Sequence, residues 1–134
     1  MNYILDTSAY SQLVRGHTAA AHALRTAENV YVPQMVIAEL RYGFQLGGRL
    51  ADNERLLQKF LAAGKVRALF TDAATTDYFV AIAVHVRRTG VQLATHDLWI
   101  AALAHQWGAT LLTYDRDFAH LGYNELQLQY ETIT

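Results

Sequence analysis

Short apolar runs along the chain alternate with longer stretches in which apolar residues recur every three or four positions. The short runs have the length and composition of strands and are followed by turn or helix-start signals. They lie at residues 2–5, 30–32, 66–70, 109–112 and 126–130. The sequence therefore predicts five short strands spread over the whole chain.

The stretches between these strands carry the periodicity of amphipathic helices. In residues 34–46, for example, Val36, Leu40 and Phe44 fall on one stripe. The predicted helices cover residues 9–15, 34–46, 52–63, 72–88 and 97–107. Because strands alternate with helices, we expect an α/β fold with a central, mostly parallel sheet flanked by helices. The chain has one proline and no linker-like stretch, so residues 1–134 are predicted to form a single domain.

Composition narrows the class of protein. The 134 residues are 52% hydrophobic and 17% charged, which excludes a disordered chain. There is no cysteine, so a disulfide framework and a cysteine zinc site are excluded, and the net charge of −1 does not by itself indicate nucleic-acid binding. No apolar run is long enough to span a membrane, and the first residues lack the pattern of a signal peptide. We therefore expect a cytoplasmic protein.

Three carboxylates directly follow predicted strands. Asp6 comes after the first strand, and Asp115 and Asp117 come after the strand at 109–112. Ligands of open parallel sheets bind beyond the carboxyl ends of the strands, so these acids are placed to share a metal site. Other interpretations stay open, because Asp6 begins a typical helix-capping sequence and the other two acids suit a turn.

Two further acids, Glu39 and Asp97, lie on predicted helices. Glu39 stands beside Leu40, on or near the buried stripe, where a carboxylate needs a cation or a partner such as Arg41. Asp97 opens its predicted helix, so capping is an alternative to metal binding. The six histidines, His96 among them, show no paired ligand spacing typical of zinc sites. Oxygen ligands of this kind indicate Mg²⁺ or Mn²⁺ instead.

Four short motifs contain these acids. They read YILDTS at residues 3–8, VIAELRYG at 36–43, DLWIAALA at 97–104 and LLTYDRDF at 111–118. Taken in this order over nearly the whole chain, they resemble the PIN domain, and specifically the VapC ribonuclease toxins of bacterial toxin–antitoxin pairs. One departure is that many relatives have a proline shortly before the third acid, whereas residues 90–96 contain none.

The resemblance implies an enzyme: an endoribonuclease toxin that uses Mg²⁺, or Mn²⁺ in its place, to hydrolyse phosphodiester bonds in a tRNA or rRNA loop. Asp6 and Asp97 would be the primary metal ligands. Glu39 and Asp115 would complete the catalytic site, as outer metal ligands or as residues that orient the attacking water, and Asp117 is the alternative to Asp115 as the fourth acid and possible metal ligand. The residues expected to support these carboxylates through hydrogen bonds are Thr7, Ser8 and Thr113.

The same resemblance implies two protein partners. One is a VapB-like antitoxin, whose C-terminal segment would place an arginine or lysine among the carboxylates. The other is a second copy of the chain, which would form a homodimer through the helix predicted at 72–88 and its neighbouring helix. Contacts with RNA phosphates and bases are assigned, by nearness in sequence, to Arg15, Arg41, Arg49, Arg116, Tyr10, Tyr42 and Tyr114. Surface solvation and core packing are the alternative explanations for these seven side chains.

Two other functions stay open from the sequence. A small phosphohydrolase or phosphotransfer domain would use Asp6 as its nucleophile. Haloacid-dehalogenase phosphatases, however, need a second aspartate where Ser8 stands, and receiver domains need a lysine at the acidic pocket, for which Lys59 and Lys65 are poorly placed. A non-catalytic PIN-like binding module would have lost acids that this chain retains.

Overall fold

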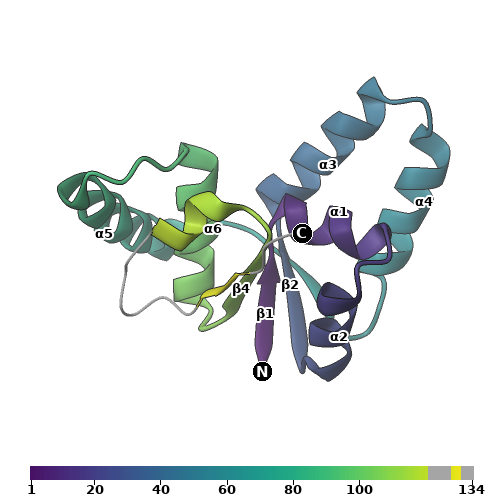
Figure 1. Cartoon of the computed structure of the whole chain (residues 1–134), viewed down its shortest axis with the longest axis horizontal. Helices are drawn as coiled ribbons and strands as arrows, with labels where there is room; N and C mark the ends of the chain where they lie inside the picture. The colour runs from purple at the N-terminus through teal and green to yellow at the C-terminus, as the bar shows by residue number, and fades with distance from the viewer. Residues whose placement is uncertain (121–127, 131–134) are drawn as a thin grey trace.

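The computed structural model describes residues 1–120 and 128–130, which form a sheet with helices on both sides (Figure 1). All strand pairs are parallel, and the strand order is β3-β2-β1-β4-β5. The strands are β1 (Asn2–Leu5), β2 (Asn29–Pro33), β3 (Val66–Leu69), β4 (Thr110–Thr113) and β5 (Leu128–Tyr130). The predicted α/β class with a parallel central sheet is therefore confirmed.

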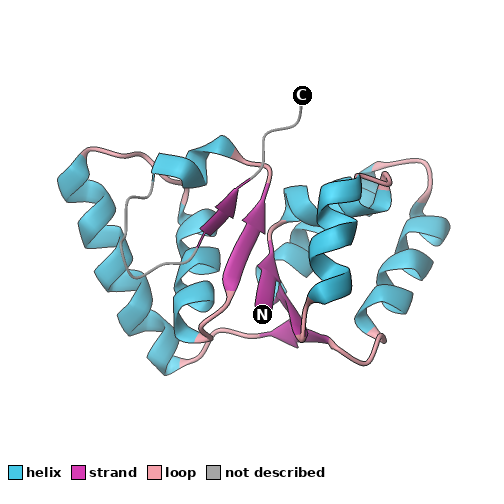
Figure 2. Ribbon diagram, turned by 60° about the horizontal axis from the view of Figure 1, so that its bottom comes forward, coloured by secondary structure: helices cyan, strands magenta, loops and turns pink. Residues whose placement is uncertain are grey.

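Within the described residues, six α-helices and one 3₁₀ helix lie between or beside these strands. They are α1 (Thr7–Val14), α2 (Thr18–Thr26), α3 (Gln34–Leu46), α4 (Leu50–Leu61), α5 (Ala73–Thr89), α6 (Thr95–Gln106) and η1 (Arg116–His120). Helices α5 and α6 lie on one side of the sheet and α1 to α4 on the other (Figures 1 and 2). No helix in the described ranges has the length and apolar character needed to cross a membrane.

The apolar side chains form two separate clusters. The larger one surrounds the central strands and includes Ile4, Leu5, Leu111 and Leu112, which are fully buried. The smaller cluster holds α5 against α6 and is formed by Ile82, Val86, Leu98, Ala101 and Ala102. Helix α5 is thus an outer layer that packs mainly on α6 rather than on the sheet.

The largest difference from the sequence prediction is α2, since no helix was predicted between residues 16 and 29. Its buried face consists of Ala20, Ala23 and Leu24, so only one large apolar side chain marks it in the sequence. Gly16 ends α1 in the left-handed region with φ of +84° and allows the chain to turn into α2. The other predicted helix and strand boundaries agree with the structure to within two residues where it describes them.

The strand order creates a site where the chain reverses direction across the sheet. The chain moves from β1 outward to β3, and then returns to the other side of β1 to form β4. Strands β1 and β4 pair with Leu5 opposite Leu112, so their carboxyl ends lie side by side. Beyond these ends, the segments that follow the two strands diverge to opposite sides of the sheet (Figure 1). Such a switch point is the usual ligand site of an open parallel sheet.

Candidate functional site

Asp6 lies at this switch point and is almost completely buried. Its Oδ1 accepts hydrogen bonds from the backbone N–H of Ala9 at 2.8 Å and from the Ser8 hydroxyl at 2.7 Å. Its Oδ2 accepts a hydrogen bond from the hydroxyl of Thr113. Asp6 therefore caps α1, as one interpretation predicted, and also belongs to the polar group at the strand ends.

The predicted supporting residues hold the two strand ends together. The Ser8 hydroxyl also accepts a hydrogen bond from the backbone N–H of Tyr114, and the Thr113 hydroxyl accepts one from that of Asp115, both at 2.9 Å. The hydroxyl of Thr7 is buried and has no hydrogen-bond partner among the residues that the structure describes. Two of the three predicted residues thus contact Asp6 directly, and the third leaves a polar atom unsatisfied beside it.

One pocket of about 270 Å³ is lined by four acids that are far apart in the sequence. Asp6 follows β1, Glu39 lies on α3, Asp97 lies on α6 and Asp115 follows β4. We call these four residues the acidic cup. Thr7, Ser8, His96 and Ile100 complete the lining.

Asp117 lies outside the acidic cup. It lines a neighbouring hollow beside the loop at 90–94 instead of the pocket that holds Asp115. Its backbone N–H donates to Oδ1 of Asp115 at 2.9 Å, so the two acids form a turn in which Asp115 is the one directed at the cup. The geometry therefore places Asp115, and not Asp117, with the other three acids.

Burial and like charges raise the pKa values of two cup acids. The pKa of Asp97 rises to about 6, first because the carboxylate is partly removed from water and then because Asp115 lies nearby. The pKa of Asp6 is also raised, mainly by burial, although its hydrogen bonds oppose that effect. Both carboxylates are thus costly to ionise in the folded chain, and a bound cation would offset this cost.

The position of Asp97 differs from the prediction that it opens its helix. Helix α6 begins at Thr95, and Ala94 is the capping residue, so Asp97 lies in the first turn. Its carboxylate lines the pocket and is not a helix cap. A negative charge in the first turn still interacts favourably with the helix dipole.

Glu39 also differs from expectation, because its side chain is 48% exposed and does not belong to the buried stripe of α3. Its partner is His96, whose Nε2 lies 3.0 Å from Oε2 of Glu39, and not an arginine. Arg41 instead pairs with Glu54 on α4 at 2.9 Å. His96 does not belong to a pair of histidines with ligand spacing, so the signal in the sequence was its position directly before Asp97.

The remaining predicted RNA contacts fall into several settings. Arg49 lies 4.0 Å from Asp52, so it and Arg41 both pair with acids near the α3–α4 turn. Tyr10 and Tyr114 are buried, as core packing would explain. Arg15, Arg116 and Tyr42 are the exposed members of the set that lie outside these two ion pairs.

The donor set of the cup fits a hard divalent cation. Carboxylate and hydroxyl oxygens dominate it, and such oxygens are the preferred ligands of Mg²⁺ and Mn²⁺. Within residues 1–120 and 128–130, no three histidine or acidic side chains lie close enough together to enclose an ion on their own. This arrangement suits an ion that keeps several of its waters and binds few protein ligands at once.

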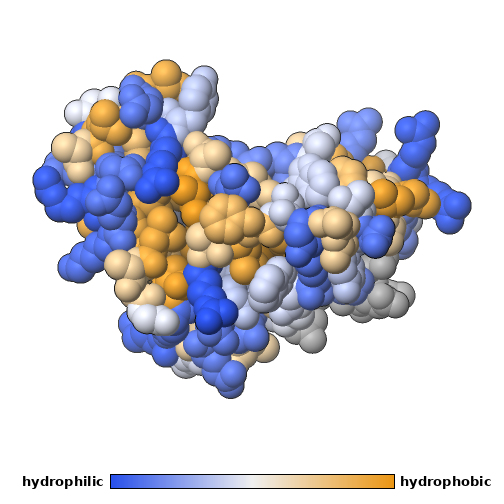
Figure 3. All heavy atoms as spheres, turned by 180° about the vertical axis from the view of Figure 1, so that it is seen from behind, coloured by the Kyte–Doolittle hydropathy of each residue, from blue (hydrophilic) through white to orange (hydrophobic). Residues whose placement is uncertain are grey.

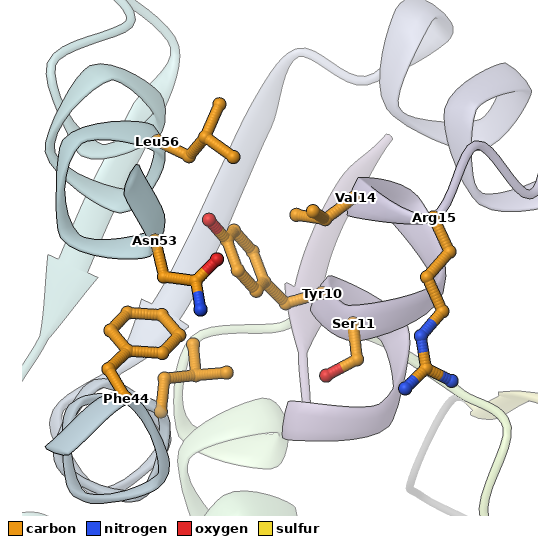
Figure 4. Close-up of a pocket in the computed structure, with 8 residues that line it drawn as sticks. Tyr10, Ser11, Val14, Arg15, Phe44, Asn53 and Leu56 are labelled. Carbon is orange, nitrogen blue, oxygen red and sulfur yellow. The ribbon is translucent and has the colours of Figure 1, made fainter. Parts of the chain in front are cut away.

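A second hollow lies between α1, α3 and α4. Figure 4 shows Tyr10 and Val14 of α1 facing Phe44 of α3 and Leu56 of α4 across a groove of about 200 Å³. Arg15 lies at one end of this groove. Apolar surface also gathers on the α3–α4 side when the molecule is seen from behind (Figure 3). An exposed apolar groove of this kind is typical of a protein-binding surface.

Comparisons with known proteins agree with the fold and with the four motifs. The family model of the PIN domain matches residues 3–123. Ribonuclease VapC5 of Mycobacterium tuberculosis is 25% identical over 124 residues, covering 88% of this chain and 86% of the relative. Ribonuclease VapC2 of Rickettsia felis is 26% identical over 117 residues, covering 84% of this chain and 86% of the relative.

Solved structures show the same architecture. The VapBC2 structure from Rickettsia felis, bound to a DNA fragment from the promoter, contains a chain that superposes with a TM-score of 0.83 at 24% identity. The match covers 97% of this chain and 98% of that one. From the family match and this agreement in fold, we conclude that the chain belongs to the PIN domain family and is similar to VapC ribonucleases.

Proposed function

We propose that the chain is a metal-dependent endoribonuclease that acts, as one PIN domain over residues 1–134, as the toxin of a toxin–antitoxin pair in the cytoplasm. The observation that carries this proposal is the acidic cup, in which four acids from separate elements line one pocket at the switch point of the sheet. The names of the VapC relatives support the choice of RNA as the substrate. A covalent phosphohydrolase is disfavoured, because both oxygens of Asp6 accept hydrogen bonds that weaken them as nucleophiles.

Each cup residue has a separate role in this proposal. Asp6 and Asp97 would be the primary metal ligands, and Glu39 and Asp115 would act as outer metal ligands or orient the attacking water. Bound Mg²⁺ or Mn²⁺ supplies an activated water and stabilises the charge that develops on the phosphate. Ser8 and Thr113 keep the Asp6 carboxylate fixed through the hydrogen bonds described above, while Thr7 is available to donate to a further ligand or water.

The substrate we propose is an unpaired loop of tRNA or rRNA. Proteins read such loops by stacking on exposed bases and by contacting the backbone phosphates. Arg116 directly follows Asp115 and is exposed, and the ring of Tyr42 is 67% exposed on the same helix as Glu39. These two side chains are therefore our choice for phosphate and base contacts, in place of the paired Arg41 and Arg49.

A VapB-like antitoxin is the proposed partner, and the groove between α1, α3 and α4 is its proposed docking site. The groove offers apolar side chains to an amphipathic segment, and a basic residue of that segment would then neutralise the cup. Leu56→Glu changes a residue whose side chain is 48% exposed, so it should weaken the complex with the product of the adjoining reading frame and leave the fold intact. Full binding by this variant in a pull-down would remove the groove from the proposal.

The chain is also proposed to form a homodimer through the outer face of α5. Val80 and Val84 are 53% and 40% exposed there, although both are apolar. Light scattering of the wild-type protein at micromolar concentration should give twice the monomer mass, and Val80→Asp with Val84→Asp should give the monomer mass. A monomeric wild-type protein would contradict this part of the proposal.

The proposed activity is tested by cleavage of a total RNA substrate in the presence of Mg²⁺. Asp6→Asn and Asp97→Asn should each reduce the rate by about a hundredfold or more, and the double variant should lose no more than either single one, because the residues act as a unit. Asp72→Asn is the matched control, since Asp72 also caps a helix but lies outside the cup. If either variant, prepared free of contaminating nuclease, cleaves RNA at the wild-type rate, the assignment of Asp6 and Asp97 to the metal site is refuted.

A further inference from the structure

The imidazole of His96 supplies a nitrogen atom to a pocket otherwise lined by oxygen ligands and carbon. His96 lines the acidic cup together with Glu39 and Asp97. Its Nε2 is buried and, among the residues that the structure describes, makes no hydrogen bond. The atom lies 3.0 Å from Oε2 of Glu39, but the approach does not have the direction of a hydrogen bond. A buried ring nitrogen in this state is unfavourable unless something else binds it.

The spacing between these two atoms is the spacing of neighbouring metal ligands. Ligands placed at right angles around an octahedral cation, each about 2.1 Å from it, lie about 3 Å from each other. The Nε2 of His96 and the Oε2 of Glu39 have this separation, and both atoms belong to side chains of the pocket lining. A cation between them would satisfy the unpaired nitrogen and neutralise the carboxylate together.

We propose that His96 is a nitrogen ligand of the metal site in this chain and that it shifts the preference of the acidic cup from Mg²⁺ toward Mn²⁺. The proposal rests on the proposed function, because it needs the cup to bind a divalent cation. Imidazole is a poor ligand for Mg²⁺, which prefers oxygen, and a good ligand for transition metals. An imidazole at this position therefore favours Mn²⁺ and contributes little to Mg²⁺ binding.

A structural role for His96 makes a different prediction. If the imidazole only kept Glu39 in place, an amide N–H at the same position would perform that task. Glutamine offers such an N–H donor but no nitrogen lone pair for a metal, so His96→Gln separates the two roles. The matched control is His22→Gln, because His22 is exposed on α2 and lines a hollow beside Tyr3 at the other end of β1.

Binding is measured by calorimetry on the full chain, with MnCl₂ and MgCl₂ as the probes. We expect His96→Gln to weaken Mn²⁺ binding by about tenfold and to change Mg²⁺ binding by less than about twofold, because only the transition metal uses the nitrogen. His22→Gln should change neither. Pulsed electron paramagnetic resonance of the Mn²⁺-loaded wild type should show coupling to an imidazole ¹⁴N, and this coupling should be lost in His96→Gln and kept in His22→Gln.

Two results would overturn the role of His96 alone. One is Mn²⁺ bound without ¹⁴N coupling, and the other is an equal loss of Mn²⁺ and Mg²⁺ affinity in His96→Gln, which would indicate that the residue acts through Glu39. If instead the wild type binds neither ion, or if Asp6→Asn binds both as the wild type does, the acidic cup is not a metal site. The proposed function then fails as well, so the two failures are distinguishable.

Discussion

Two aspartates of this chain begin helices in the same way and have opposite electrostatic outcomes. Asp6 and Asp72 each accept a hydrogen bond from the backbone N–H three residues later, at the starts of α1 and α5. The pKa of Asp6 is raised, mainly by burial, whereas the pKa of Asp72 is lowered, first by the side-chain amide of Gln106. The capping motif is common to both, so the difference comes from what surrounds each carboxylate.

The surroundings of Asp72 are neutral donors and open solvent. Thr75 and Gln106 donate to its carboxylate, which links the start of α5 to the end of α6. Asp6, in contrast, is buried close to Asp115 and Asp97, whose charges disfavour its own. Asp72 therefore stabilises the fold, whereas ionisation of Asp6 is made unfavourable by burial and like charge, and a bound cation would offset that cost. Substitutions around these two aspartates test this contrast through the stability of the metal-free chain, from the largest expected effect to the smallest.

Thr113→Val should have the largest effect on the stability of the metal-free chain. The substitution removes a hydroxyl that donates to buried Asp6 and accepts from the backbone N–H of Asp115. At pH 7 the free energy of unfolding should fall by about 1–3 kcal/mol, since buried polar groups lose their partner. Urea unfolding measures this change. Gln106→Leu removes a hydrogen-bond donor from exposed Asp72 and should lower the free energy of unfolding by less than Thr113→Val does. A loss equal to or larger than that of Thr113→Val would contradict the contrast.

Asp97 should make the metal-free chain less stable as pH rises. Its folded pKa of about 6 exceeds its ordinary value of 3.8, so the folded chain binds this proton more tightly than the unfolded chain does. The free energy of unfolding should therefore decrease between about pH 4 and pH 6, by about 1–2 kcal/mol once partial solvent screening is included. Thermal melts in EDTA test this. Asp97→Asn should remove the decrease, and an unchanged pH profile would show that Asp97 carries no such cost.

Asp115→Asn should stabilise the metal-free chain at pH 7 more than Asp117→Asn does. Asp115 lines the cup and raises the pKa of both Asp97 and Asp6, whereas Asp117 raises the pKa of Asp97 less than Asp115 does and lines the neighbouring hollow. A gain of up to about 1 kcal/mol is expected for Asp115→Asn, as for the relief of a partly screened like-charge contact. If Asp117→Asn is instead the more stable variant in EDTA, Asp117 rather than Asp115 belongs to the acidic cup.

Asp72 should have the smallest effect on the pH dependence of stability, and the sign of its effect should be opposite to that of Asp97. Because its folded pKa is lowered, its contribution to stability is present above the ordinary value of 3.8 and is lost as pH falls through the folded pKa. Acid unfolding of Asp72→Asn should therefore begin from a slightly lower stability at pH 7 and change less below about pH 4 than that of the wild type. If Asp72→Asn is instead more stable than the wild type at pH 7, Asp72 behaves like the acids of the cup and the contrast fails.

Much of the fold could be predicted from the sequence because its strands and most of its helices have clear periodicity. Helix α3, for example, was predicted with the bounds that the structure gives, since Val36 and Leu40 mark its buried side. Helix α2 was missed because alanine forms most of its buried face and gives little contrast. Residues 126–127, the start of the last predicted strand, lie outside the described residues.

The site was predictable to the extent that it follows from strand ends. Asp6 and Asp115 come after β1 and β4, and pairing of these strands brings them together. The side to which a helical residue points is harder to predict. Glu39, in the middle of α3, was expected on or near the buried stripe, and Asp97, in the first turn of α6, was expected to open its helix. The contact of His96 with Glu39 could not be predicted for a different reason: it joins two helices that are distant in the sequence.

The central claim is that the acidic cup stores a repulsion that a divalent cation relieves. Thermal or urea unfolding at pH 7, with EDTA or with Mg²⁺, tests it most directly. Mg²⁺ at one hundred times its dissociation constant should stabilise the wild type by about 2.7 kcal/mol. Asp97→Asn should be more stable than the wild type in EDTA and gain less from Mg²⁺, while Asp72→Asn should gain as much as the wild type. A full Mg²⁺ gain in Asp97→Asn, or none in the wild type, would contradict the claim.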